Sequence, residues 1–160
     1  MELVEQVAPR KGRNVVIAID GVYSKYAYQW YLDNVRLNDD QVFLVHAVDK
    51  NETLALQQFS NPYSFDPDLL ASTLTKEKER VTDSLQQYAN LLAETGVNGT
   101  VRSVHTKTPG EGIIKAAKEL DADLIITGSQ GLGLLRRTLI GSCMDYVLTH
   151  SPVPVVIARQ

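Results

Sequence analysis

The amino-acid sequence predicts an α/β protein with a single domain, in which a five-stranded parallel sheet of order 3-2-1-4-5 is doubly wound with helices on both faces. Short apolar segments alternate with helical segments along the chain, and such alternation is typical of parallel strands joined by crossover helices. Several of the short segments are apolar at nearly every position, which is typical of strands covered on both faces. The length of 160 residues suits one domain.

Five segments are predicted to be strands because they are short, apolar and rich in β-branched residues. The first is a nearly continuous apolar run that ends in an acid, and the third is the weakest of the five. In chain order they are residues 14–20, 42–48, 100–104, 123–127 and 153–158.

Capping residues and apolar periodicity predict the helices between these strands. Ser24 can cap the first helix, and Asp66 followed by Pro67 gives the second helix an N-cap and a proline at its first position. Gly96 is expected to end this second helix. Its apolar side chains recur at helical spacing, at Val81, Leu85, Tyr88 and Leu92.

Two further helices are predicted near the C-terminus. One opens at Thr108-Pro109 and runs through Leu120, and the last opens at Ser142 with a Ser-x-x-Asp capping box. Residues 50–65 have no clear period and are predicted to be a loop.

The composition of the chain argues against several classes of protein and of partner. Hydrophobic residues make up 44% of the chain, which is ordinary for a globular protein, and no apolar run approaches the roughly 20 residues that span a membrane. The net charge of −3 argues against a nucleic-acid or anionic-membrane partner. Residues 1–13 are predicted to be a flexible N-terminal tail before a domain at 14–160. With one cysteine and no secretory signal in this tail, a cytoplasmic location is expected.

A spaced glycine motif is the strongest functional signal. Gly128 and Gly131 follow the fourth strand, and Gly141 and Ser142 precede the last helix. Backbone N–H groups in such a loop and at a helix N-terminus can hold an anion, typically phosphate. Between Gly128 and the last helix the charged residues are Arg136 and Arg137, which serve equally well as phosphate contacts or as a solvated loop face. The chain lacks the G-x-x-x-x-G-K-[ST] pattern of a P-loop.

Asp20 closes the first strand and is a candidate for the sugar of a nucleotide. If the first and fourth strands are neighbours, Asp20 and Gly128 open onto the same crevice, where a carboxylate can accept hydrogen bonds from ribose hydroxyls. A solvated helix-capping acid explains Asp20 equally well.

The spacing Gly128-x2-Gly131-x9-Gly141-Ser142 resembles the G-x2-G-x9-G-[ST] motif of the nucleotide-binding branch of the universal stress protein family. The resemblance extends over most of residues 14–159, including the first strand with its closing aspartate and the last strand.

This resemblance implies an adenine nucleotide, with ATP expected, alone or with Mg²⁺ on its phosphates. Asp20 would meet the ribose, and Ala18, Ile19 and the backbone of Ala47 would meet the adenine. Cys143 stands where the family usually has valine or threonine. The residues implied to surround the phosphates are Gly128, Ser129, Gln130, Gly131, Gly141, Ser142 and Cys143.

No residue pattern indicates a reaction centre or a metal site. His46, His105 and His150 have no companions at ligand spacing, so no catalytic residue is predicted and the protein is expected to be at most a weak ATPase. The expected function is an ATP-binding, stress-linked sensor or adaptor. The alternatives are a stress protein that works by protein contacts without nucleotide, and a slow ATP hydrolase. The resemblance also implies a homodimer through the C-terminal strand, with a downstream protein partner that the sequence does not identify.

Overall fold

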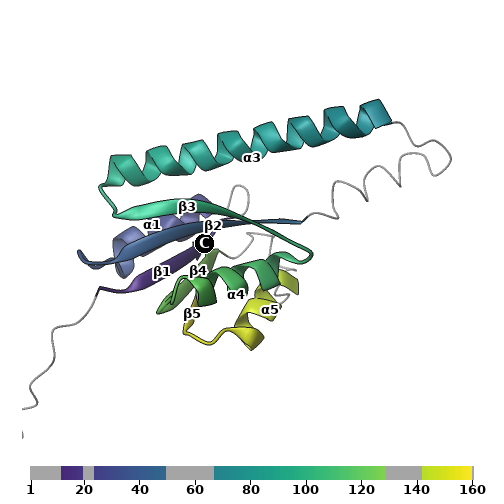
Figure 1. Cartoon of the computed structure of the whole chain (residues 1–160). Helices are drawn as coiled ribbons and strands as arrows, with labels where there is room; N and C mark the ends of the chain where they lie inside the picture. The colour runs from purple at the N-terminus through teal and green to yellow at the C-terminus, as the bar shows by residue number, and fades with distance from the viewer. Residues whose placement is uncertain (1–11, 20–23, 50–66, 129–141, 160) are drawn as a thin grey trace, which may run out of the picture.

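A computed structural model of the chain describes residues 12–19, 24–49, 67–128 and 142–159 (Figure 1). Its strands form one sheet in the order β3-β2-β1-β4-β5, and every neighbouring pair is parallel. This arrangement confirms the predicted fold class and strand order. The strands are β1 (Asn14–Ala18), β2 (Gln41–Asp49), β3 (Gly99–Thr106), β4 (Leu124–Gly128) and β5 (Val155–Ala158).

The described helices cover both faces of the sheet (Figure 1). They are α1 (Ser24–Asn34), α3 (Pro67–Thr95), α4 (Pro109–Glu119) and α5 (Ser142–His150). Side chains from α1 and α3 form one core cluster with the sheet, whereas side chains from α4 and α5 form a second cluster on the opposite face. The chain therefore winds in both directions from the middle of the sheet.

The central strand shows why its sequence is apolar at nearly every position. Val15 and Ile17 belong to the cluster beneath α1, and Val16 between them belongs to the cluster beneath α4. All three side chains are 0% exposed. Because successive side chains of a strand point to opposite faces, a strand covered on both sides needs apolar residues at every position.

The strands β1 and β5 are shorter than predicted, whereas α3 ends where the sequence predicts. β1 is two residues shorter than predicted, although the N–H of Ile19 still donates to the carbonyl of Val45 at 2.8 Å. β5 begins at Val155 instead of 153 because Pro154 has no N–H to donate to a ladder. α3 ends before Gly96, whose φ of 64° favours glycine.

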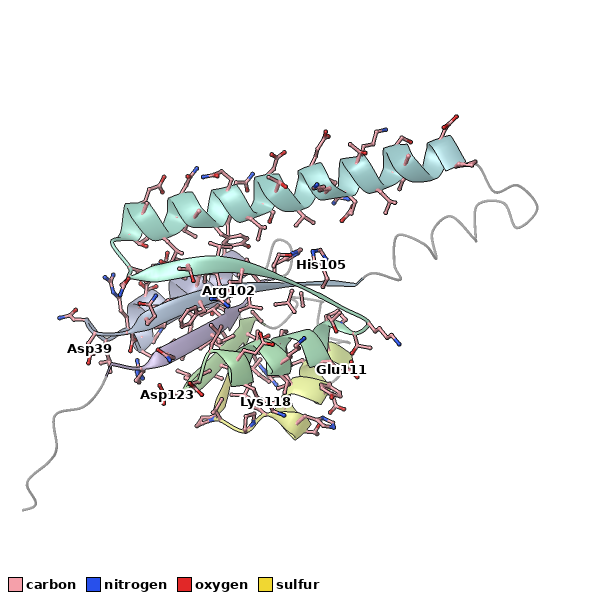
Figure 2. All side chains as sticks on the ribbon, viewed as in Figure 1. Asp39, Arg102, His105, Glu111, Lys118 and Asp123 are labelled. Carbon is pink, nitrogen blue, oxygen red and sulfur yellow. The ribbon has the colours of Figure 1, made fainter. Side chains whose placement is uncertain are left out.

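The amino edge of the sheet is held by a network of four residues, Arg13, Tyr31, Leu37 and Asp40, which we call the amino-edge network. Arg13 Nε and Nη2 donate to the two carboxylate oxygens of Asp40, each at 2.8 Å. The Tyr31 hydroxyl and the Leu37 N–H also donate to Asp40 Oδ2, at 2.8 and 2.9 Å. In Figure 2, Asp39 and Asp123 lie at the amino edge of the sheet, and Glu111 lies at the opposite, carboxyl edge. Of the predicted tail, only residues 12 and 13 are described, and Arg13 is fixed in this network.

The network compensates the cost of burying a charge. Asp40 is only 3% exposed, and burial alone would raise its pKa. Hydrogen bonds from Arg13, Leu37 and Tyr31 outweigh burial and hold the pKa of Asp40 below its usual value. Burial and the hydrogen bond to Asp40 raise the pKa of the Tyr31 phenol, so it stays a protonated donor.

Candidate nucleotide-binding site

The middle of the sheet contains a point where the winding reverses. β1 continues through α1 to β2 on one side, whereas β4, its neighbour, continues through α5 to β5 on the other. The register pairs Ile17 with Ile126, so Ile19 and Gly128 both lie two residues further along, at the carboxyl edge. Ala18 precedes Ile19 at the end of β1. Ligands of open α/β sheets bind at such a reversal, and three predicted site residues are therefore brought together there.

Ala47 lies on β2 at the same edge and faces α4. It is half-buried and packs against the core cluster beneath α4 and α5. In the register with β3 it is paired with Val104. Because the register also pairs Ala18 with Val45, Ala47 lies two residues further toward the carboxyl edge. The structure thus places the predicted adenine contacts of β1 and β2 on adjacent strands.

Cys143 lies in the first turn of α5 and is half-buried against the same core cluster. It follows Ser142, the first residue of the helix, as the sequence predicts. The first turn of α5 lies against the first turn of α4, where a Cβ on Gly110 would lie 3.0 Å from the carbonyl oxygen of Cys143. The N–H groups and the dipole at a helix N-terminus favour an anion. The structure confirms a helix after the glycine motif, and the role of this helix in holding phosphate stays a prediction.

The remaining predicted site residues lie outside the described part of the chain. Their roles in the site remain predictions from the sequence. These residues are Asp20, Ser129, Gln130, Gly131 and Gly141. The role of the Ser142 side chain also remains a prediction, because that side chain is not described.

Sequence analysis missed two glycines that lie against the described part of the site. Gly110 and Gly112 occupy the first turn of α4 and are both buried. A Cβ on Gly110 would lie 3.0 Å from the carbonyl oxygen of Cys143, and a Cβ on Gly112 would lie 3.4 Å from the Cβ of Ala47. Two glycines in one helical turn, each unfavourable for a helix by roughly 1 kcal/mol relative to alanine, were the signal that could have found them.

Among the described residues, no group of three or more His, Cys, Asp and Glu side chains could hold a metal ion. His105 is exposed on β3, and the ring of His150 at the end of α5 stacks on Tyr146 at 3.9 Å between centroids. His46 is half-buried in β2. No helix in the described ranges is long and apolar enough to cross a membrane.

Comparison with known proteins identifies relatives along almost the whole chain. The sequence model of the Universal stress protein family matches residues 12–159. A protein of Staphylococcus saprophyticus that is named as a universal stress protein is 28% identical over 150 residues, which cover 92% of this chain and 83% of the relative.

Solved structures show the same fold at lower sequence identity. A universal stress protein family protein from Arabidopsis thaliana, solved with AMP bound, is 17% identical, has a TM-score of 0.66 and is matched over 92% of both chains. A universal stress protein in complex with cAMP is 19% identical with a TM-score of 0.55, and the match covers 93% of this chain and 98% of that one.

Proposed function

The chain belongs to the universal stress protein family, and on this premise we propose that it binds an adenine nucleotide at the carboxyl edge of its sheet. The observation that carries the proposal is the adjacency of β1 and β4 at the reversal of winding, with the spaced glycine motif running from the end of β4 to the start of α5. The AMP and cAMP found in two proteins of the same fold support this ligand class.

The proposed site has two halves. Ala18, Ile19 and the backbone of Ala47 form the adenine half, and Asp20 receives the ribose. The other half consists of backbone N–H groups, which can surround phosphates because glycine leaves no Cβ in the way. ATP is the proposed nucleotide, alone or with Mg²⁺ on its phosphates. The phosphate half is made of Gly128, Ser129, Gln130, Gly131, Gly141, Ser142 and Cys143.

Nucleotide binding would serve a sensor or adaptor better than a catalyst. A ligand present at 100 times its dissociation constant stabilises the state that binds it by about 2.7 kcal/mol, which is enough to couple the fold or its assembly to the cellular nucleotide level. The binding domain is proposed to span residues 14–160 of a cytoplasmic protein. No described residue is assigned a role in bond cleavage.

This function can be tested on protein that has been purified without added nucleotide. Heat denaturation followed by chromatography should release AMP, ADP or ATP, and calorimetry on stripped protein should detect ATP but not GTP. Steady release of phosphate from ATP, abolished by Gly131→Val, would favour the slow hydrolase instead. A preparation that neither carries nor binds an adenine nucleotide would favour a stress protein that works only by protein contacts.

The edge position of β5 supports a proposed homodimer. The sheet ends at β5, whose apolar residues would invite pairing with a second copy. Val156 packs against the core beneath α1, whereas Ile157 is half-buried outside both core clusters. We therefore expect Ile157→Lys to separate the dimer without placing a charge in the monomer core. Light scattering at micromolar concentration should report a dimer for the unmodified protein and a monomer for the variant, and a monomeric unmodified protein would contradict the assembly.

A further inference from the structure

The sheet ends in β3 on one side and in β5 on the other, and these two outer strands differ in charge. No described strand lies beyond either of them. β5 has the sequence VVIA, whereas β3 has the sequence GTVRSVHT and exposes the side chains of Arg102 and His105, which Figure 2 labels. Among the described residues Arg102 forms no ion pair. β3 therefore presents a cation that no described carboxylate neutralises.

The main-chain groups on the outer side of β3 can be assigned from its pairing with β2. The Val42 N–H donates to the carbonyl of Asn98 at 2.9 Å, and the register pairs Val42 with Gly99. Because the N–H and C=O groups of successive residues in a strand point alternately to its two sides, every second residue from Asn98 faces β2. The residues between them direct their N–H and C=O groups away from the sheet. These residues are Gly99, Val101, Ser103 and His105.

A second copy of β3 fits this outer side poorly. The four outward-facing residues are centred on Arg102, so an antiparallel pair that joins all four to those of a second copy would place the two Arg102 side chains directly opposite each other. Like charges in that position destabilise a strand pair, whereas opposite charges stabilise it. The charge of β3 thus favours an acidic strand from a different protein over a second copy.

We propose that β3 binds an extended segment of a partner protein, which adds a strand to the sheet and places a carboxylate opposite Arg102. Extended segments bind exposed sheet edges in this way, with main-chain hydrogen bonds providing affinity and side chains providing specificity. The inference goes beyond nucleotide binding and does not depend on it. It assigns the two outer strands to different partners, β5 to a second copy of this chain and β3 to another protein.

The two faces of the sheet define the side chains that the partner needs. Val101 packs against the core cluster beneath α1 and α3, whereas Val104 packs against the cluster beneath α4 and α5. Because side chains alternate between faces, Arg102 lies on the same face as Val104. The partner's carboxylate must point to that face. Its neighbours in the added strand point to the other face, where Val101 is only half-buried, so apolar residues on both sides of the acid fit best.

Hydrogen exchange of the whole protein tests whether the outer side of β3 is open. The N–H groups of Val101 and Ser103 should exchange at least about tenfold faster than those of Arg102 and Val104, which face β2. Equal protection of all four in the protein alone would mean that another part of the chain or a second copy already occupies β3. That result would overturn the proposal.

The acetylated peptide Thr-Val-Glu-Val-Thr, added at millimolar concentration, is the probe for binding, and the same peptide with lysine in place of glutamate is its control. The glutamate peptide should slow the exchange of the Val101 and Ser103 N–H groups and bind about fivefold more tightly than the lysine peptide in an NMR titration. Arg102→Glu should reverse this preference. Lys107→Glu, which makes the same charge change just after the strand, should preserve it. Binding of neither peptide, equal binding of both, or a preference for glutamate that persists in Arg102→Glu would overturn the proposal.

Discussion

The amino edge and the carboxyl edge of the sheet differ in the groups that make their contacts. At the amino edge, side chains are joined to each other, and Asp40 receives hydrogen bonds from Arg13, Tyr31 and Leu37. Toward the carboxyl edge, two glycines of α4 leave room for their neighbours: Gly110 lies against Cys143 and Tyr146, and Gly112 lies against Thr106 and Ala47. The polar groups of the amino-edge network are satisfied within the protein, whereas the ligand contacts proposed at the carboxyl edge are mostly main-chain groups.

With the nucleotide site proposed above, this contrast assigns stability and binding to opposite ends of the same strands. A buried charge with every partner in place fixes a fold but has nothing left to offer a ligand. Helix N-termini and glycine loops carry partial positive charge without side-chain obstruction and suit an anion. Changes at one edge should therefore leave the property of the other edge intact.

The largest expected effect is at the carboxyl edge. Gly131→Val should lower ATP affinity by at least about a thousandfold, because a β-branched side chain would fill the space of the phosphates. The melting temperature without ligand should change little. The control is Gly96→Val, which places the same side chain at a positive-φ glycine with open space after α3 and should leave ATP affinity unchanged. ATP binding by Gly131→Val at the unmodified affinity would refute the phosphate assignment.

At the amino edge, Asp40→Asn should lower the free energy of unfolding by about 3 kcal/mol, because the half-buried Arg13 guanidinium loses its charged partner and the buried position of Asp40 loses its charge-assisted hydrogen bonds. The affinity of the folded protein for ATP should be unchanged. Asp39→Asn is the neighbouring exposed control and should change stability by less than about 0.5 kcal/mol. Urea unfolding measures both, and equal effects of the two substitutions would contradict a special role for Asp40.

Acid should weaken the same edge through Asp40. Its pKa in the folded protein lies below the ordinary value of 3.8, so the folded state favours the ionised form. This contribution to stability is fully present above the ordinary pKa and is lost as the pH falls from there through the lowered pKa. Urea midpoints between pH 5 and pH 2 should fall more steeply for the unmodified protein than for Asp40→Asn. Parallel curves would show that Asp40 does not contribute.

The smallest expected effect is at Ser142, which we expect to contribute both to stability and to ATP binding. Ser142 is the first residue of α5, and the sequence predicts that its side chain caps this helix; loss of an N-cap costs about 1 kcal/mol of stability. Because the sequence also assigns Ser142 to the phosphates, Ser142→Ala should reduce both the melting temperature without ATP and the further rise on adding ATP. Differential scanning fluorimetry gives both values. A variant with the parent's melting temperature and the parent's ATP response would assign the serine to neither task.

The fold could be predicted from the sequence because its signals are local. Val15, Val16 and Ile17 are apolar because both faces of β1 are covered, and Pro67 and Gly96 mark the ends of α3 through their own backbone preferences. The predicted placement of Ala18, Ile19 and Gly128 at one edge follows from strand order alone.

Contacts between distant segments could not be predicted in the same way. Arg13 and Asp40 are 27 positions apart, and neither differs in sequence from an ordinary surface charge, so Arg13 was assigned to the tail. Gly110 and Gly112 could not be connected with Ala47 and Cys143 because the relevant property is the distance between packed elements. The sequence contains no period or cap that reports such a distance.

The most direct test of a nucleotide site at the carboxyl edge is a backbone-amide NMR titration of the stripped protein with AMP. The account predicts that the amide signals of Ile19, Ala47, Gly128 and Cys143 move with a common dissociation constant, while those of Arg13 and Asp40 stay in place. Absence of any shift at millimolar AMP, or shifts centred on the amino-edge network, would contradict it.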